Sequence, residues 1–420
     1  MNLRSVWLLL VLEMLGSFGA NSQNENPFEA LDERQTVDST LLSFMNTDRH
    51  EVQIAFAYVN EREKLVRHTF GPVNEAYFYP ASTVKMVVAA LALEKLHRLG
   101  IEGLTVENPM QTFAGRPVQT AAFLDSESPS GYRTIDEYIH QIFIASDNEA
   151  YNRLYEFLGV DYINRRLGEM GYKARIVHRL SAPEYNVQEN LYTNPVRFYD
   201  PEGQTLYHQG LVKSGETYTK RLYDLPGQRK GKAFYDGERE KTIPLAFDFS
   251  QKNAIGLEDL QDFLMALVWP EMVTEDKRLH LSEGDRKRLL KHMGSWPRES
   301  HRLEYQELPP DYVKFFLTAA EDTSILRIYN KVGYAYGTLT DVSYILDAEA
   351  EISYFLAATI LVNKNGIFND NVYEYEEDGR VFFDALSKYI REWVISEGLH
   401  SFENPRVSEL WEGQRPKKTE

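Results

Sequence analysis

The sequence contains no cysteine among its 420 residues. This absence excludes disulfide bonds, thiol catalysis and cysteine-ligated metals. The ten histidines show no paired spacing of the kind that binds metals, and no glycine-rich phosphate-binding loop is present. We therefore expect neither a metal nor a cofactor.

Positive charge is also scarce. The chain has 46 Lys and Arg against 63 Asp and Glu, which gives a formal net charge of -17. Nucleic-acid binding requires a basic face, so this balance argues against a nucleic-acid partner. Hydrophobic residues make up 43% of the chain, which suits a globular protein with one large domain or two ordinary ones.

Long apolar runs are absent except near the N-terminus. A basic start, MNLR, precedes the short apolar stretch SVWLLLVLEMLGSFGA, which contains Glu13 and ends in small residues. This pattern predicts a signal peptide over residues 1–20 and export to the periplasm or the medium, with no stable membrane span after cleavage. An N-terminal amphipathic helix or a retained anchor is the competing interpretation.

The pattern of apolar residues predicts an α+β fold. Strands are expected near both ends of the chain and helices mostly between them, so the terminal strands should share one antiparallel sheet with flanking helices and an inserted, mainly helical region. Residues 160–200 are predicted to be loops. The predicted strands are residues 52–59, 65–69, 324–330, 339–346 and 352–362, and the predicted helices are residues 29–45, 77–96, 135–144, 149–158, 257–268, 283–293 and 381–394.

The composition changes between residues 201 and 249, where glycine, proline and tyrosine replace helical periodicity. We interpret this segment as a β-rich or loop-rich insertion near the mouth of a site or at a partner surface. The expected organisation is therefore one domain over residues 21–400, interrupted by this insertion and followed by a C-terminal tail at 401–420.

The stretch YFYPASTVKMVVAALALEKL predicts a helix that is apolar nearly all round, yet Lys85 lies near its start. Such a helix is normally buried, and burial favours the neutral form of a lysine. Ser82 precedes Lys85 by three residues, so both lie on one face, and a neutral amine can remove the proton of a neighbouring hydroxyl. A chance spacing, with Lys85 reaching to water, is the competing interpretation.

Two further motifs are weak when taken alone. Ser146-Asp147-Asn148 precedes a predicted helix, where Ser146 and Glu149 also fit a capping box. The sequence Lys331-Val332-Gly333 ends a predicted strand, where a turn is the ordinary interpretation.

Together and in this order, the three motifs resemble the S-x-x-K, S-D-N and K-T-G set of class A β-lactamases and penicillin-binding proteins. The resemblance covers residues 28–397, because strands precede the first motif, helices flank the second, and two strands and a helix follow the third. It implies a β-lactamase/DD-peptidase-like fold. The spacing between the second motif and the third is wide for the family, and the insertion accounts for most of the excess.

The resemblance implies roles for individual residues. Ser82 would be the acylated nucleophile and Lys85 its base, while Ser146 would pass protons to the leaving nitrogen. The backbone N–H groups of Ser82 and Tyr334 would form an oxyanion hole. The implied substrate-binding residues are Asn148, Lys331, Gly333 and Tyr334.

The sequence departs from the family pattern in two places. Val332 occupies a position that usually carries a hydroxyl for a substrate carboxylate, and Tyr334 and Thr338 are the candidate replacements. In the loop RLSAPEYN, Ala182 stands where class A enzymes have a deacylating glutamate before the proline. Glu184 is a candidate deacylation base, with an ordinary surface carboxylate as the competing interpretation.

The leading hypothesis is an exported serine hydrolase that forms an acyl-enzyme on Ser82 with a β-lactam, a peptidoglycan-type substrate or a related amide or ester. A D-alanyl peptidase or esterase with slow deacylation is the alternative among enzymes. A penicillin-binding sensor or scaffold without turnover is the alternative among binding proteins.

Overall fold

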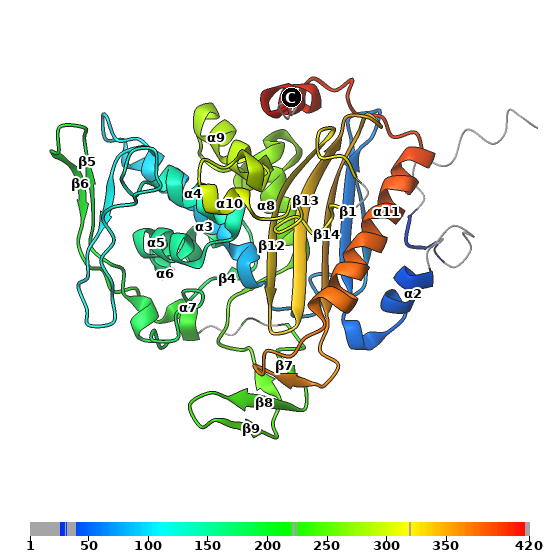
Figure 1. Ribbon diagram of the computed structural model, residues 1–420, viewed down its shortest axis with the longest axis horizontal. Helices are drawn as coiled ribbons and strands as arrows, with labels where there is room; N and C mark the ends of the chain where they lie inside the picture. Colours follow the sequence, from blue (N-terminus) through cyan, green and yellow to red (C-terminus); the bar gives the residue numbers. More distant parts are fainter. Residues whose placement is uncertain are drawn as a thin grey trace, which may run out of the picture.

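A five-stranded antiparallel sheet lies at the centre of the molecule (Figure 1). The computed structural model describes residues 26–29, 31, 39–220, 223, 225–318 and 321–415. The predicted signal peptide lies outside these residues. So do residues 30 and 32–38 of the predicted helix at 29–45, whose last part is described as α2 (Ser39–Met45).

The sheet joins both ends of the chain, which confirms the predicted fold class. Its strand order is β12-β13-β14-β1-β2, so the first strand pairs with one near the C-terminus, with Ala55 opposite Ala357. The strands are β1 (Gln53–Val59), β2 (Leu65–Phe70), β12 (Leu326–Ala335), β13 (Thr338–Asp347) and β14 (Ile352–Leu361).

Helices cover both faces of this sheet (Figure 1). On one face, α11 (Val381–Ser396) and α2 pack against Phe56 and Leu356 of the strands. On the other face, the larger helical region packs against Ala55 and Ala357. Because both faces are buried, β1 (QIAFAYV) and β14 (ISYFLAATIL) are apolar at nearly every position instead of alternating. The helices of this larger region are α3 (Val84–Leu99), α4 (Ile135–Ala145), α5 (Asn148–Leu158), α6 (Val160–Glu169), α8 (Leu257–Val268), α9 (Glu283–Gly294) and the short α10 (Leu303–Gln306).

The prediction of loops throughout residues 160–200 is wrong, because α6 begins at Val160 directly after α5. Val160, Ile163 and Leu167 are all fully buried and have the spacing of one helical face. Gly159, with a φ of 79°, ends α5 and changes the direction of the chain before α6 begins. The apolar stripe is present in the sequence but is only ten residues long, between a glycine and a proline-containing loop.

Strand β12 is longer than predicted. It continues to Ala335, so Lys331 and Gly333 lie within the strand and not in a turn after it. The extra length arises because β13 pairs with β12 in register up to Ala335 and Thr338. The motif is therefore held by ladder hydrogen bonds.

The inserted segment is built from short elements that pair with distant parts of the chain. Strand β6 (Thr205–Gln209) joins a small sheet with β5 (Val196–Tyr199) and β3 (Met110–Thr112), and β8 (Ala233–Asp236) pairs with β15 (Ile367–Phe368). Figure 1 shows β7, β8 and β9 below the lower end of the central sheet. The remaining short elements are α7 (Thr217–Lys220), β4 (Ala174–Arg175), β7 (Arg229–Lys230), β9 (Lys241–Ile243), β10 (Phe247–Asp248) and β11 (Ala254–Ile255).

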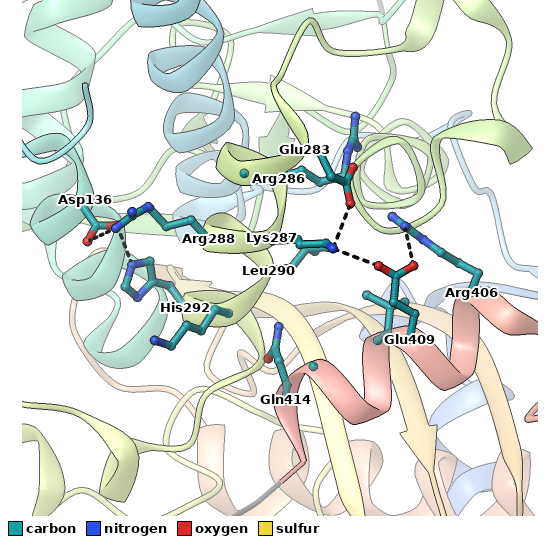
Figure 2. Close-up of a pocket in the computed structure, with 14 residues that line it drawn as sticks. Asp136, Glu283, Arg286, Lys287, Arg288, Leu290, His292, Arg406, Glu409 and Gln414 are labelled. Carbon is teal, nitrogen blue, oxygen red and sulfur yellow. Dashed lines mark hydrogen bonds and ion pairs between the residues drawn. The ribbon is translucent and has the colours of Figure 1, made fainter. Parts of the chain in front are cut away.

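The predicted C-terminal tail contains helix α12 (Pro405–Gln414), which packs on the helical region. Val407 is fully buried, and Glu409 forms an ion pair with Lys287 of α9 at 3.0 Å (Figure 2). Arg406 donates to the carbonyl oxygen of Val268 at the end of α8. Within the described part of the chain, no helix has the length and apolar character needed to cross a membrane.

Candidate active site

A cavity of about 690 Å³ opens between the helical region and the edge strand β12. Its walls come from the turn before α3, the turn between α4 and α5, the β12–β13 hairpin, and two loops near residues 181 and 369–375. It is lined by Tyr79, Ala81, Ser82, Ala145, Ser146, Asp147, Asn148, Leu180, Ser181, Tyr312, Val313, Tyr334, Ala335, Tyr336, Asn369, Asn371, Tyr373 and Tyr375.

Ser82 lies on a short 3-10 turn, Ala81–Thr83, that leads into α3. The hydroxyl of Thr83 donates to the carbonyl oxygen of Pro80 at 2.7 Å and stabilises the turn. Ser82 is half-buried and faces the cavity. Lys85 follows it in the first turn of α3.

The backbone around the cavity is strained. Ala81, Ser146, Ser181 and Tyr336 line it, and all four have left-handed backbone conformations with φ between 45° and 54°. Such conformations cost non-glycine residues roughly 1–3 kcal/mol each and persist only where the surroundings impose them. Their concentration here points to a preorganised site.

Lys85 is fully buried, and its ammonium nitrogen meets the second motif. Nζ donates to the backbone oxygen of Ser146 at 2.5 Å and to Oδ1 of Asn148 at 2.8 Å. It also lies 3.3 Å from the Ser146 hydroxyl oxygen. The amide of Asn148 in turn donates from Nδ2 to the hydroxyl of Ser181 at 3.0 Å.

Lys331 reaches the same serine from the sheet. Its Nζ donates to Oγ of Ser146 at 2.9 Å and to the carbonyl oxygen of Val332 at 2.9 Å. The hydroxyl of Ser146 therefore lies between two lysine side chains, which approach from α3 and from β12.

The surroundings favour the neutral forms of both lysines. Burial, followed by repulsion from Lys331, holds the pKa of Lys85 well below its ordinary value, although the nearby Asp147 opposes the shift. Burial also lowers the pKa of Lys331 to about 7, against the opposing charge of Asp341. A neutral amine at Lys85 is able to accept a proton.

The β12–β13 hairpin orients the backbone of Tyr334. Its two-residue turn, Tyr336 and Gly337, has φ values of 53° and 77°, as a type I′ turn requires. Ala335 and Thr338 form the closing pair, and hydrogen-bonding direction alternates along a strand. The N–H of Tyr334 therefore points to the open edge of β12 and not toward β13.

The open edge of β12 lies against the turn that carries Ser82. Lys314 donates to the carbonyl oxygen of Ile328 at 2.6 Å, so the backbone of Ile328 faces this open edge. Ile328 and Tyr334 are separated by an even number of positions on β12, so their backbone groups face the same edge. A Cβ atom at Gly333 would lie 2.5 Å from the oxygen of Pro80 and 2.8 Å from the nitrogen of Ser82. Only glycine allows this close approach.

The sequence profile of the beta-lactamase enzyme family matches residues 37–377. The chain belongs to this family. No curated protein sequence matches it.

Solved beta-lactamase structures resemble this one at low sequence identity. A beta-lactamase from Burkholderia ambifaria is 14% identical with a TM-score of 0.47, and the match covers 85% of this chain and 98% of the other. A class A beta-lactamase from Mycobacterium abscessus is 16% identical with a TM-score of 0.45, covering 87% and 99%. The enzyme from Streptomyces albus G is 14% identical with a TM-score of 0.47, covering 84% and 97%.

The departures from the beta-lactamase family pattern have distinct surroundings. Val332 is buried in the apolar cluster on the α11 face of the sheet. Of its two candidate replacements, Tyr334 lines the cavity, whereas Thr338 is buried and is not among the lining residues. Glu184 is exposed and does not line the cavity either, so Asp147 is the only carboxylate among the lining residues.

Several lining residues were not predicted from the sequence. Ser181 holds the amide of Asn148, and five tyrosines line the cavity in addition to the predicted Tyr334. The run NDNVYEY, which supplies Asn369, Asn371, Tyr373 and Tyr375, fits neither helical nor strand periodicity. The density of aromatic and amide side chains in this loop is the sequence feature that could have indicated these lining residues.

Proposed function

We propose that this protein is an exported serine hydrolase that forms an acyl-enzyme on Ser82 with a β-lactam or a related amide or ester. The observation that carries the proposal is the buried Lys85, which lies one helical turn after Ser82 and contacts Ser146. Two buried amines around one hydroxyl have little structural use, because burying them is unfavourable.

The proposed reaction begins at the Ser82 hydroxyl. Neutral Lys85 takes its proton, and Oγ attacks the acyl carbon of the substrate. The N–H groups of Ser82 and Tyr334 stabilise the developing oxyanion. As the C–N bond breaks, the proton on Lys85 passes through the Ser146 hydroxyl to the leaving nitrogen, and the acyl group remains as an ester on Ser82.

The neighbouring groups support this relay. Lys331 and Lys85 both donate to the Ser146 oxygen, which leaves the hydroxyl proton of Ser146 free to point toward the leaving nitrogen while the oxygen receives the proton from Lys85. Asn148 positions Lys85, because its Oδ1 accepts from Nζ while its amide group is held by Ser181.

Labelling with a fluorescent penicillin tests the proposal. We expect the wild-type protein to take up one label, Ser82→Ala to take up none, and peptide mapping to locate the adduct on Ser82. Ser43→Ala, on the exposed side of α2, is the matched control and should label as the wild type does. Labelling that persists in Ser82→Ala would assign the nucleophile to another residue. Penicillin binding without any covalent label would favour the sensor alternative.

The contact at Gly333 predicts a second effect on acylation. The added methyl of Gly333→Ala would push β12 away from the backbone of Ser82 and open the oxyanion hole. Losing one such donor typically slows acyl transfer by about 10²–10³-fold. The acylation rate and the melting temperature would be measured together. Gly210→Ala is the control, because a Cβ there meets nothing within 4 Å. A Gly333→Ala protein that melts normally and acylates at the wild-type rate would contradict the proposed hole.

A further inference from the structure

The cavity that contains Ser82 continues into a second lobe of about 640 Å³. Both lobes are lined by Tyr79, Leu180, Ser181, Tyr336 and Asn369, so they are contiguous. The inserted segment and the residues directly after it contribute part of the wall of the second lobe, including Glu238 and Lys252. A ligand acylated at Ser82 therefore has room to extend toward the insertion.

The lobe that contains Ser82 offers no exposed cation. Its lining includes neither lysine nor arginine, and Asp147 is its only charged residue. Lys85 and Lys331 lie beneath it, where their side-chain nitrogens are buried and engaged by Ser146. Val332 removes the usual hydroxyl. An anionic group on a substrate would therefore need a cation from outside this lobe.

Two of the basic side chains in the second lobe are engaged within the protein. Arg179 is buried, donating to Glu156 at 2.9 Å and to the carbonyl oxygen of Tyr192 at 2.9 Å. His178 contacts the oxygen of Arg179 through Nδ1 at 2.6 Å and accepts at Nε2 from the backbone of Asn253 at 3.1 Å. Neither group is available to a ligand.

Lys252 differs from both. It is half-buried, and its Nζ lies 5.7 Å from the centre of the Tyr336 ring, which both lobes share. Among the residues that the structure describes, no carboxylate lies within ion-pair distance of this ammonium, Glu238 of the same lobe included. The backbone of Lys252 is held firmly, because its oxygen accepts from Arg175 at 2.6 Å and its N–H donates to Phe249 at 2.9 Å.

We propose that Lys252 binds a carboxylate of the substrate, so that this protein acts on anionic acyl amides or esters that extend from Ser82 across Tyr336 into the second lobe. In this arrangement Lys252, directly after the insertion, supplies a contact for the carboxylate in place of the hydroxyl that the altered third motif lacks at Val332. The ring of Tyr336 holds the ammonium beside the shared wall of the two lobes. This inference rests on the proposed function.

Equilibrium binding separates this inference from the acylation chemistry. The probes are benzylpenicillin, which carries a carboxylate, and its methyl ester, which does not. Both would be titrated calorimetrically into Ser82→Ala protein, where no adduct forms. We expect the acid to bind more tightly than the ester, and Lys252→Ala in this background to reduce that preference by about 10- to 100-fold, the range for a hydrogen-bonded charge.

Two matched variants complete the test. Lys252→Arg keeps the charge and should keep most of the preference, and Lys241→Ala removes an exposed lysine of β9 that lines neither lobe and should not alter it. A preference for the acid that survives Lys252→Ala, or the absence of binding by either probe, would overturn the inference. Failure of the proposed function has a different signature, namely no covalent adduct on Ser82 of the wild-type protein.

Discussion

Replacing Lys85 with methionine is expected to slow acylation of Ser82 by about 10²–10⁴-fold, the usual contribution of a positioned general base. Methionine matches the length and the buried, apolar surroundings of the lysine stem, so the fold should survive. The rate would be measured by stopped-flow with a chromogenic β-lactam.

Lys95→Met is the matched control for this substitution. Lys95 lies on the same helix and is half-buried, with a pKa lowered by burial to about 7, but its Nζ contacts Phe157 and Gln209, away from the cavity. We expect this variant to lose stability and to acylate at the wild-type rate. Equal losses of acylation in both variants would indicate a general effect of removing a buried lysine.

The pH dependence of the acylation rate tests whether Lys85 is neutral. A base acts only when deprotonated, so the rate should rise with pH and level off once Lys85 is neutral. Because burial and Lys331 hold the pKa of Lys85 well below 10.5, the plateau should be reached well below pH 10.5. The apparent pKa of this profile belongs to Lys85 and Lys331 together, because the two amines interact. A rising limb centred near 10.5 would contradict a neutral Lys85.

The acyl-enzyme formed with a penicillin is expected to persist for many minutes. Deacylation needs a base to activate water, and the only carboxylate among the residues lining the Ser82 lobe, Asp147, is engaged as the cap of α5, accepting from the N–H of Ala150 at 2.7 Å. Glu184 is exposed outside the cavity. Intact-protein mass spectrometry after brief exposure should show one added antibiotic mass that decays slowly.

A carboxylate at position 182, where class A enzymes have the deacylating glutamate, should shorten the lifetime of the acyl-enzyme. Ala182 follows Ser181 of the cavity wall and is half-buried. We expect Ala182→Glu to accelerate adduct loss by up to about 10²–10⁴-fold. Ala182→Gln has nearly the same shape without a base and should leave the lifetime long. Rapid turnover of penicillin by the wild-type protein, with no adduct trapped, would mean that another group activates water.

The sequence contained enough information to predict most of the fold and to name residues that meet in the candidate site. Apolar runs at both ends predicted the shared antiparallel sheet, and the structure pairs β1 with β14. The three motifs predicted a group of residues that the structure brings together, since Lys85, Asn148 and Lys331 all meet at or beside Ser146. The misses include helix α6 and the end of β12, where a short stripe and a long-range strand partner gave little local signal. The helix predicted at 77–96 begins only at Val84, after the 3-10 turn Ala81–Thr83, and the predicted tail contains α12.

What the sequence by itself determined is which reactive groups are present and which share a local face, as Ser82 and Lys85 do at a spacing of three. Only the tertiary structure decided that Lys85 is buried beside a second cation, that Glu184 lies outside the cavity, and that Lys252 stands at its second lobe. Periodicity along the chain follows from backbone geometry, which neighbouring residues set. Desolvation and the distance between charges depend instead on which remote segments pack together, and those two quantities control the pKa of a base and the reach of a binding cation.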